Sequence, residues 1–128
     1  MGVASPDVGG AREKTTVCRG DIVEVDLEPV AGREMAKTRP CLVVTNNTAN
    51  RYSAVISVVA ITSREPSKNY PFMVEIPKSA NMPKRSWVDA AHLRTVDRSR
   101  LTGRYYTSLD KATMEKVDDA LKEQLSLP

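Results

Sequence analysis

Residues 54–61 are the feature that most limits the folds open to this chain. The segment reads Ala-Val-Ile-Ser-Val-Val-Ala-Ile, so that only Ser57 is polar. A strand whose side chains are apolar on both faces is buried on both sides and belongs in the centre of a sheet. The 128 residues are enough for one domain with a modest core. That core therefore has to form around 54–61.

Other segments predict further strands. Residues 21–27 alternate polar and apolar side chains with a period of two, which is typical of a half-buried strand. Residues 39–45 contain Leu42, Val43 and Val44 in succession and predict a second strand buried on both faces. Shorter strands are predicted over 72–76, 86–89 and 92–96.

The C-terminal part predicts a helix. Residues 97–108 read as a connection, Ser108 as the helix N-cap and Asp110 as part of the first turn. One apolar stripe follows at steps of three and four residues, made of Met114, Val117, Leu121 and Leu125.

Strands followed by a single helix, with no regular βα alternation, disfavour a parallel sheet. They predict a mainly β domain: a small, curved antiparallel half-barrel with a C-terminal α-helix packed on it. Residues 1–16 lack an apolar period and are predicted to be a disordered tail, which leaves 17–128 as the domain.

Composition narrows the function only a little. The net charge of +3 suits an anionic partner if the positive charge gathers on one face. No apolar run approaches the ~20 residues that span a bilayer, and no secretion signal is evident, so we expect a cytoplasmic protein without a membrane role. Cys18 and Cys41 are expected to be reduced thiols that pack as small apolar side chains. Two cysteines and one histidine cannot complete a four-ligand zinc site, and no metal or cofactor is expected.

Arg39 stands out among the candidate functional residues. Pro40 fixes its own φ and holds Arg39 in extended geometry at the mouth of a core strand. A guanidinium there needs an anionic partner, and its planar fork of donors suits a phosphate or a carboxylate. If 39–45 and 54–61 pair antiparallel, Thr62, Ser63 and Arg64 lie at the same rim as Arg39. On these residues alone, a structural ion pair of Arg39 is the commoner explanation and a phosphate site the alternative.

Several kinds of chemistry are excluded by motif. The chain has no phosphate-binding glycine loop, no GxSxG and a single histidine, and its acids are scattered. Transesterification of RNA without a metal ion needs none of these motifs, because the nucleophilic 2′-OH belongs to the substrate. Arg39 would then neutralise the phosphorane, Thr62 would orient a phosphate oxygen, and Glu34 is a candidate base.

A family resemblance supports this interpretation. The chain is similar to the MazF/PemK family of toxin endoribonucleases over 18–127. The segments that carry the resemblance are 19–29 (RGDIVEVDLEP), 32–34 (GRE), 39–44 (RPCLVV), 60–63 (AITS), 70–74 (YPFMV) and 93–101 (LRTVDRSRL).

The resemblance implies an SH3-like, CcdB-like curved sheet in a homodimer. It implies sequence-specific cleavage of single-stranded RNA without metal, leaving a 2′,3′-cyclic phosphate and a 5′-hydroxyl. It also implies the toxin of a type II toxin–antitoxin system, whose cognate antitoxin blocks the site with an acidic, disordered C-terminal tail.

The resemblance also assigns roles by position. The family's catalytic arginine falls on Arg39 and its threonine on Thr62, while Glu34 is kept in a loop where Arg33 replaces a serine. Lys37 stands where many relatives have small residues. The expected catalytic residues are therefore Arg39, Thr62 and Glu34, and the expected RNA contacts are Arg33, Lys37, Asn46, Ser63 and Arg64.

Several of these positions keep more than one interpretation. Glu34 suits a base, a contact to an RNA base, or a solvated loop residue. His92, where many relatives have glutamine, suits a half-buried residue near a dimer interface better than an RNA-stacking or acid/base residue. Tyr70 and Trp87 suit the core better than base stacking.

Two other functions fit the same fold. A CcdB-like toxin would bind and poison a protein such as DNA gyrase, and an inactive module would bind RNA or antitoxin without chemistry. Arg39 and Thr62 favour the nuclease, because a protein poison needs no pair of groups to align a phosphate.

Overall fold

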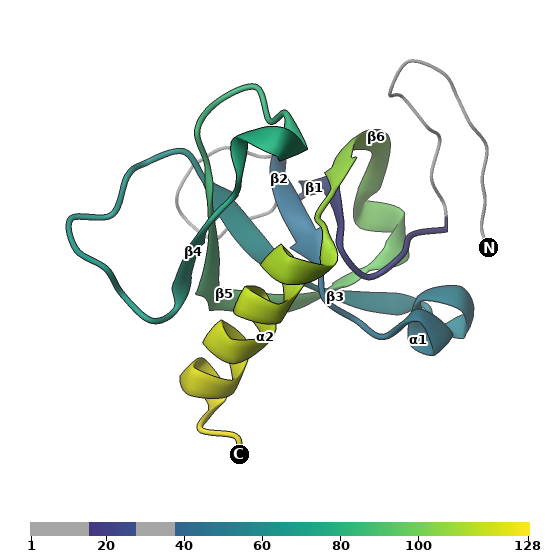
Figure 1. Cartoon of the computed structure of the whole chain (residues 1–128). Helices are drawn as coiled ribbons and strands as arrows, with labels where there is room; N and C mark the ends of the chain where they lie inside the picture. The colour runs from purple at the N-terminus through teal and green to yellow at the C-terminus, as the bar shows by residue number, and fades with distance from the viewer. Residues whose placement is uncertain (1–15, 28–37) are drawn as a thin grey trace, which may run out of the picture.

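The computed structural model describes residues 16–27 and 38–128 (Figure 1). Of the predicted tail, residues 1–15 lie outside this range. Within it, six strands form one antiparallel sheet in the order β4-β5-β3-β2-β1-β6. The strands are β1 (Asp21–Asp26), β2 (Thr38–Val43), β3 (Val55–Thr62), β4 (Met73–Glu75), β5 (Trp87–Asp97) and β6 (Leu101–Ser108). The helices are α1 (Asn47–Tyr52), α2 (Lys111–Leu125) and the 3-10 turns η1 (Lys78–Ala80) and η2 (Arg98–Arg100).

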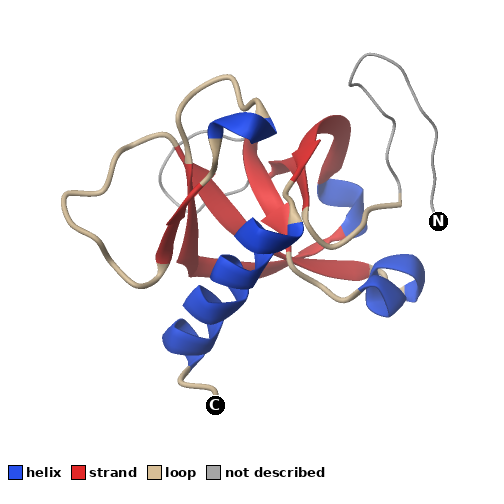
Figure 2. Ribbon diagram, viewed as in Figure 1, coloured by secondary structure: helices blue, strands red, loops and turns tan. Residues whose placement is uncertain are grey.

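The sheet is curved and carries α2 across one face, as Figure 2 shows, which confirms the predicted fold class. β3 pairs with β5 on one side and with β2 on the other. Its side chains alternate between two hydrophobic clusters. Val59 and Ile61 pack with Val117 of α2, whereas Ile56 and Val58 pack on the opposite face. The predicted central strand, buried on both faces, is confirmed.

The start of α2 differs from the prediction. Its N-cap is Asp110, whose carboxylate accepts a hydrogen bond from the Thr113 amide at 2.8 Å. Ser108 is instead the last residue of β6, and its hydroxyl donates to the buried carboxylate of Asp21 at 2.7 Å. Of the predicted apolar stripe, Val117 is fully buried, whereas Leu125 is 48% exposed.

Three further elements correct the sequence interpretation. The segment read as a connection contains β6, an eight-residue strand whose pairing with β1 is irregular and in which Gly103 has φ +99°. The two short strands predicted over 86–96 are one strand, β5, interrupted by a bulge. The helix α1 was not predicted; Asn46 caps it by accepting a hydrogen bond from the Ala49 amide at 2.9 Å.

Both cysteines are free thiols. Cys41 is buried as expected, and burial raises its pKa to about 12 against the opposing charges of Arg39 and Arg94. Cys18 is exposed, so the prediction that both thiols pack as small apolar side chains is wrong for Cys18. Within the described ranges, no helix combines the length and apolar character that crossing a membrane requires.

Candidate active site

Arg39 and Thr62 lie side by side at one rim of the sheet. β2 and β3 are antiparallel with Cys41 opposite Ala60, and continuing this register by two residues places Arg39 opposite Thr62. The Nη2 atom of Arg39 donates a hydrogen bond to the Ile61 carbonyl oxygen at 3.4 Å. The structure thus brings together the two residues that antiparallel pairing predicted to share a rim.

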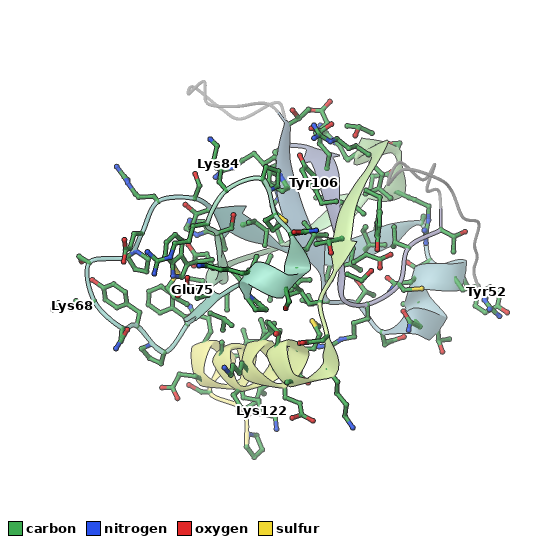
Figure 3. All side chains as sticks on the ribbon, turned by 45° about the horizontal axis from the view of Figure 1, so that its top comes forward. Tyr52, Lys68, Glu75, Lys84, Tyr106 and Lys122 are labelled. Atoms are coloured by element: carbon green, nitrogen blue, oxygen red, sulfur yellow. The ribbon has the colours of Figure 1, made fainter. Side chains whose placement is uncertain are left out.

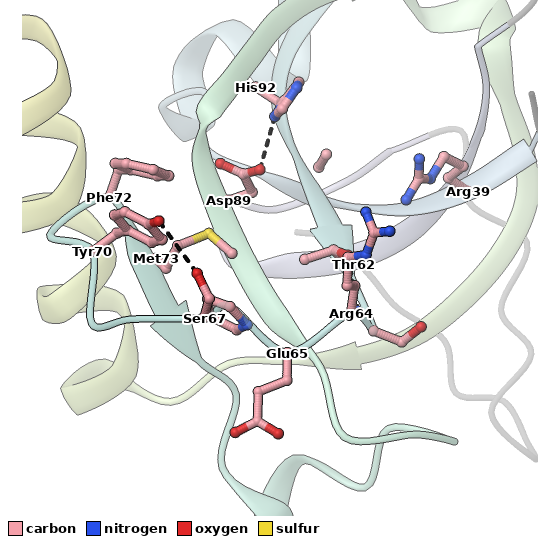
Figure 4. Close-up of a pocket in the computed structure, with 13 residues that line it drawn as sticks. Arg39, Thr62, Arg64, Glu65, Ser67, Tyr70, Phe72, Met73, Asp89 and His92 are labelled. Carbon is pink, nitrogen blue, oxygen red and sulfur yellow. Dashed lines mark hydrogen bonds and ion pairs between the residues drawn. The ribbon is translucent and has the colours of Figure 1, made fainter.

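A cavity of about 780 Å³ opens beside this pair (Figure 4). Thr62 and Ala60 both line it. They alternate with Val59 and Ile61, which pack toward α2, so the cavity lies on the opposite face of the sheet. The lining residues are Arg39, Ala60, Thr62, Ser63, Arg64, Glu65, Pro66, Ser67, Tyr70, Phe72, Met73, Asp89 and His92.

The Thr62 hydroxyl is oriented by the segment that follows β3. Its oxygen accepts a hydrogen bond from the Arg64 backbone amide at 3.1 Å. A hydroxyl that accepts in this way still has its own proton to donate. Thr62 therefore offers a donor next to the guanidinium of Arg39, which together suit a phosphate group.

Of the predicted RNA contacts, Ser63 and Arg64 are exposed and line this cavity. Asn46 lies beyond the other end of β2, where it caps α1, and is not part of the cavity. Arg33, Glu34 and Lys37 lie outside the described residues.

The cavity also contains a hydrogen-bonded pair of side chains that the sequence analysis did not predict. The Nδ1 atom of His92 lies 2.8 Å from the Asp89 carboxylate. The His92 side chain is 72% exposed in the single chain and that of Asp89 only 15%. The prediction that His92 is half-buried near a dimer interface stays a prediction. The only sequence signal was an aspartate three residues before the sole histidine.

The two aromatic side chains considered for base stacking, Tyr70 and Trp87, lie in different surroundings. Tyr70 stacks on Phe72 with ring centroids 5.1 Å apart, and both line the cavity. Trp87 is 6% exposed and lies beneath the guanidinium of Arg85. The core assignment is confirmed for Trp87, whereas Tyr70 faces the space where a base could stack.

A second cavity of about 250 Å³ adjoins Arg39 on its other side. Lys84, Arg104 and Tyr106 line it, with Arg104 over the Tyr106 ring at 4.6 Å; Lys84 and Tyr106 are labelled in Figure 3. Burial raises the pKa of Tyr106 above its ordinary value. Arg39 thus borders two spaces, each with further basic side chains.

The sequence and the fold are similar to those of known proteins. Residues 18–125 match the family described as "PemK-like, MazF-like toxin of type II toxin-antitoxin system". Endoribonuclease EndoA of Bacillus subtilis is 40% identical over 112 residues, which cover 87% of this chain and 96% of that protein.

Solved structures agree with this match. An endoribonuclease from a mycobacterial species has a TM-score of 0.73 at 29% identity, covering 88% of this chain and 94% of the other. A mycobacterial endoribonuclease in complex with its cognate antitoxin has a TM-score of 0.74 at 28% identity, covering 88% and 98%. MazF of Deinococcus radiodurans has a TM-score of 0.72 at 28% identity, with the same coverage as that complex.

Proposed function

The chain belongs to the PemK/MazF family of toxin endoribonucleases, and we propose that it cuts single-stranded RNA at a short sequence without a metal ion. The observation that carries this proposal is the meeting of Arg39 and Thr62 at the rim of a cavity large enough for a nucleotide. The natural system would be a type II toxin–antitoxin pair in the cytoplasm.

The reaction we propose is an in-line transesterification. The substrate's 2′-OH attacks the adjacent phosphorus, the bond to the 5′-oxygen breaks, and a 2′,3′-cyclic phosphate and a 5′-hydroxyl result. Arg39 stabilises the extra negative charge of the phosphorane, and the Thr62 hydroxyl donates to a phosphate oxygen. Donors that are already placed act more strongly on the transition state than donors that must reorganise.

Substrate binding would use the residues around this pair. Ser63, Arg64 and Tyr70 line the cavity; Ser63 and Arg64 would contact the RNA backbone, and Tyr70 would stack on a base. Arg33, Lys37 and Asn46 stay predicted RNA contacts, and Glu34 stays a candidate base.

The charge of Arg39 supports chemistry without a metal ion. The positive charge that a metal would bring to the phosphate is supplied here by Arg39.

The partners of this function are a second copy of the chain and an antitoxin. Complexes of relatives with a cognate antitoxin, or of MazE with MazF, have been solved. An acidic, disordered segment of an antitoxin would be attracted by Arg39, Arg64, Lys84 and Arg104 around the two cavities and would exclude RNA from them.

The CcdB-like alternative is not favoured. The family match names PemK-like and MazF-like toxins, and the 40% identical relative is an endoribonuclease. Binding to a protein target would also not require Arg39 and Thr62 to lie together, because no phosphate has to be aligned.

The test is cleavage of a long, defined single-stranded RNA by purified, antitoxin-free protein in EDTA, with ends mapped by primer extension. We expect cuts at one short sequence, 5′-hydroxyl ends and no effect of EDTA. Arg39→Ala should abolish cleavage and leave the oligomeric state unchanged. Intact RNA with folded wild-type protein, or loss of activity in EDTA, would refute the proposal.

A further inference from the structure

A bulge in β5 places His92 at the cavity. Val59 of β3 pairs with Leu93, but the next residue, Ala60, pairs with Asp89. Residues 90–92 therefore have no counterpart on β3. Bulges of this kind redirect side chains and are common beside active sites.

The bulge is held from both sides. The Ala90 amide donates to the Phe72 carbonyl at 2.9 Å, and Ala90 itself is fully buried in the cluster below α2. The Asp89 carboxylate accepts from the Ala91 amide at 3.0 Å through one oxygen and contacts His92 through the other. His92 thus projects into the cavity from a fixed segment.

The contact with Asp89 determines which nitrogen of His92 is available. A carboxylate only accepts hydrogen bonds, so Nδ1 of the imidazole must carry the proton that is shared with it. In the neutral ring, Nε2 then has a free lone pair and can take a proton. A carboxylate behind a histidine also stabilises the imidazolium that forms when it does so.

Asp89 lies within reach of a substrate held by Arg39 and Thr62. Asp89 is opposite Ala60, Ala60 is two residues from Thr62, and Arg39 flanks Thr62 on the other neighbouring strand. Neighbouring strands are about 4.8 Å apart and successive residues rise about 3.4 Å, so two strand spacings and an offset of two residues separate the backbones of Arg39 and Asp89 by roughly 12 Å. Figure 4 shows the side chains of Arg39, Thr62, Asp89 and His92 around one hollow, which leaves room for one phosphodiester and its ribose.

We propose that His92, and not Glu34, is the general base of the RNA cleavage and that Asp89 is its positioning residue; this inference rests on the function proposed above. Nε2 of His92 removes the proton of the 2′-OH while the 2′-oxygen forms its bond to phosphorus. The bond from phosphorus to the 5′-oxygen breaks, its electron pair stays on that oxygen, and the oxygen takes a proton from water. His92 then releases its proton to solvent.

Other charged and titratable groups share this cavity with His92. Among the described residues they are Arg39 from β2, Arg64 and Glu65 after β3, Tyr70 before β4, and Asp89 from β5. Arg94 also follows in β5 and is exposed. Arginine stays protonated through the working range, so a change of rate between pH 5 and 8 reports on histidine more directly than on these neighbours.

The experiment is the pH dependence of kcat/KM for wild type, His92→Gln and Asp89→Asn on one RNA, mapped first with wild-type protein. For His92→Gln we expect about a 100-fold loss, as is typical when a general base is removed. The rise in rate between pH 5 and 8 should disappear in this variant. Affinity for the same RNA with a 2′-deoxyribose at the cut site should change less than about threefold, since an uncleavable substrate reports on binding separately from chemistry.

Two controls separate loss of the base from general damage to β5. Added imidazole should restore part of the activity of His92→Ala, since a small base can enter the space that the side chain leaves. Thr95→Ala, on the exposed part of the same strand, should cleave at the wild-type rate. Asp89→Asn should lower kcat more than it changes KM. If His92→Gln keeps the wild-type rate and pH profile while Arg39→Ala is inactive, His92 is not the base although the protein is a nuclease. If wild type does not cut RNA, the proposed function itself fails.

Discussion

The guanidinium of Arg39 donates to the carbonyl oxygen of Ile61, the residue immediately before Thr62. The charge and the hydroxyl proposed for catalysis are thereby attached to the same strand end. Since Ile61 is buried in the cluster that α2 covers, the carbonyl that orients Arg39 belongs to a rigid part of the sheet. This is the arrangement expected of donors that are placed before the substrate arrives.

We predict that Arg39→Lys is nearly as damaging as Arg39→Ala. Lysine keeps the charge but not the planar fork, so it cannot hold the Ile61 carbonyl and two phosphate oxygens together. We expect kcat/KM to fall by about 10²- to 10³-fold, the scale of one lost transition-state donor. Single-turnover cleavage of a defined RNA measures this, and a lysine variant at the wild-type rate would show that charge alone suffices.

Thr62 offers a matched pair of variants. Thr62→Ala removes the donor and should lower kcat about 10²-fold. Thr62→Ser keeps the hydroxyl and the acceptor for the Arg64 amide, so most of the activity should remain. Equal losses in the two variants would mean that the methyl group matters and not the hydroxyl.

The two thiols should differ in reactivity. Cys18 is exposed, whereas Cys41 is buried with its pKa raised to about 12 and carries almost no thiolate near neutral pH. Alkylation with iodoacetamide at pH 7.5 should label Cys18 alone, as intact mass would show, and both thiols should react in denaturant. Rapid labelling of Cys41 in the folded protein would contradict its burial. Cys18→Ser and Cys41→Ser identify the labelled site.

The cap of α2 should make part of the stability depend on pH. Hydrogen bonds to Thr113 hold the pKa of Asp110 below its ordinary value of 3.8 in the folded protein. A carboxyl with a depressed pKa stabilises the fold above that ordinary value, and this contribution is lost as pH falls through the folded-state pKa. Asp110→Ala should therefore lower Tm by a few degrees at pH 7 and by less at pH 3 or below.

Asp110→Asn is the matched control for the cap. Asparagine caps helices about as well as aspartate but does not titrate in this range. Its Tm at pH 7 should stay close to that of wild type. A Tm difference between Asp110→Ala and wild type that is equal at both pH values would show that the charge of Asp110 plays no part.

The fold could be predicted where hydrophobic periodicity is strong. Residues 54–61 and Leu42–Val43 gave the central strands, because burial on both faces leaves an unbroken apolar run. β6 was missed because Gly103 and the polar residues around it break the alternation of an irregularly paired strand. β5 was divided in two because residues 90–92 belong to a bulge, which periodicity cannot represent.

The candidate site could be predicted only in part, for a similar reason. Arg39 and Thr62 follow from antiparallel pairing of two recognisable strands, so their meeting needed no three-dimensional information beyond the pairing. The contact between Asp89 and His92 depends on the bulge, and the place of Asn46 depends on the short helix α1. Both are local departures from regular structure, which a pattern of polar and apolar residues does not record.

The position of β3 has a consequence for how such a toxin can be controlled. A strand with partners on both edges and packing on both faces is among the last parts of a domain to open to solvent. Thr62 at its end would therefore keep its place through the small fluctuations that loosen peripheral loops. Local unfolding of peripheral segments would therefore do little to inhibit this protein. Control would instead come from a bound partner that covers the cavity reversibly, or from degradation of the whole chain.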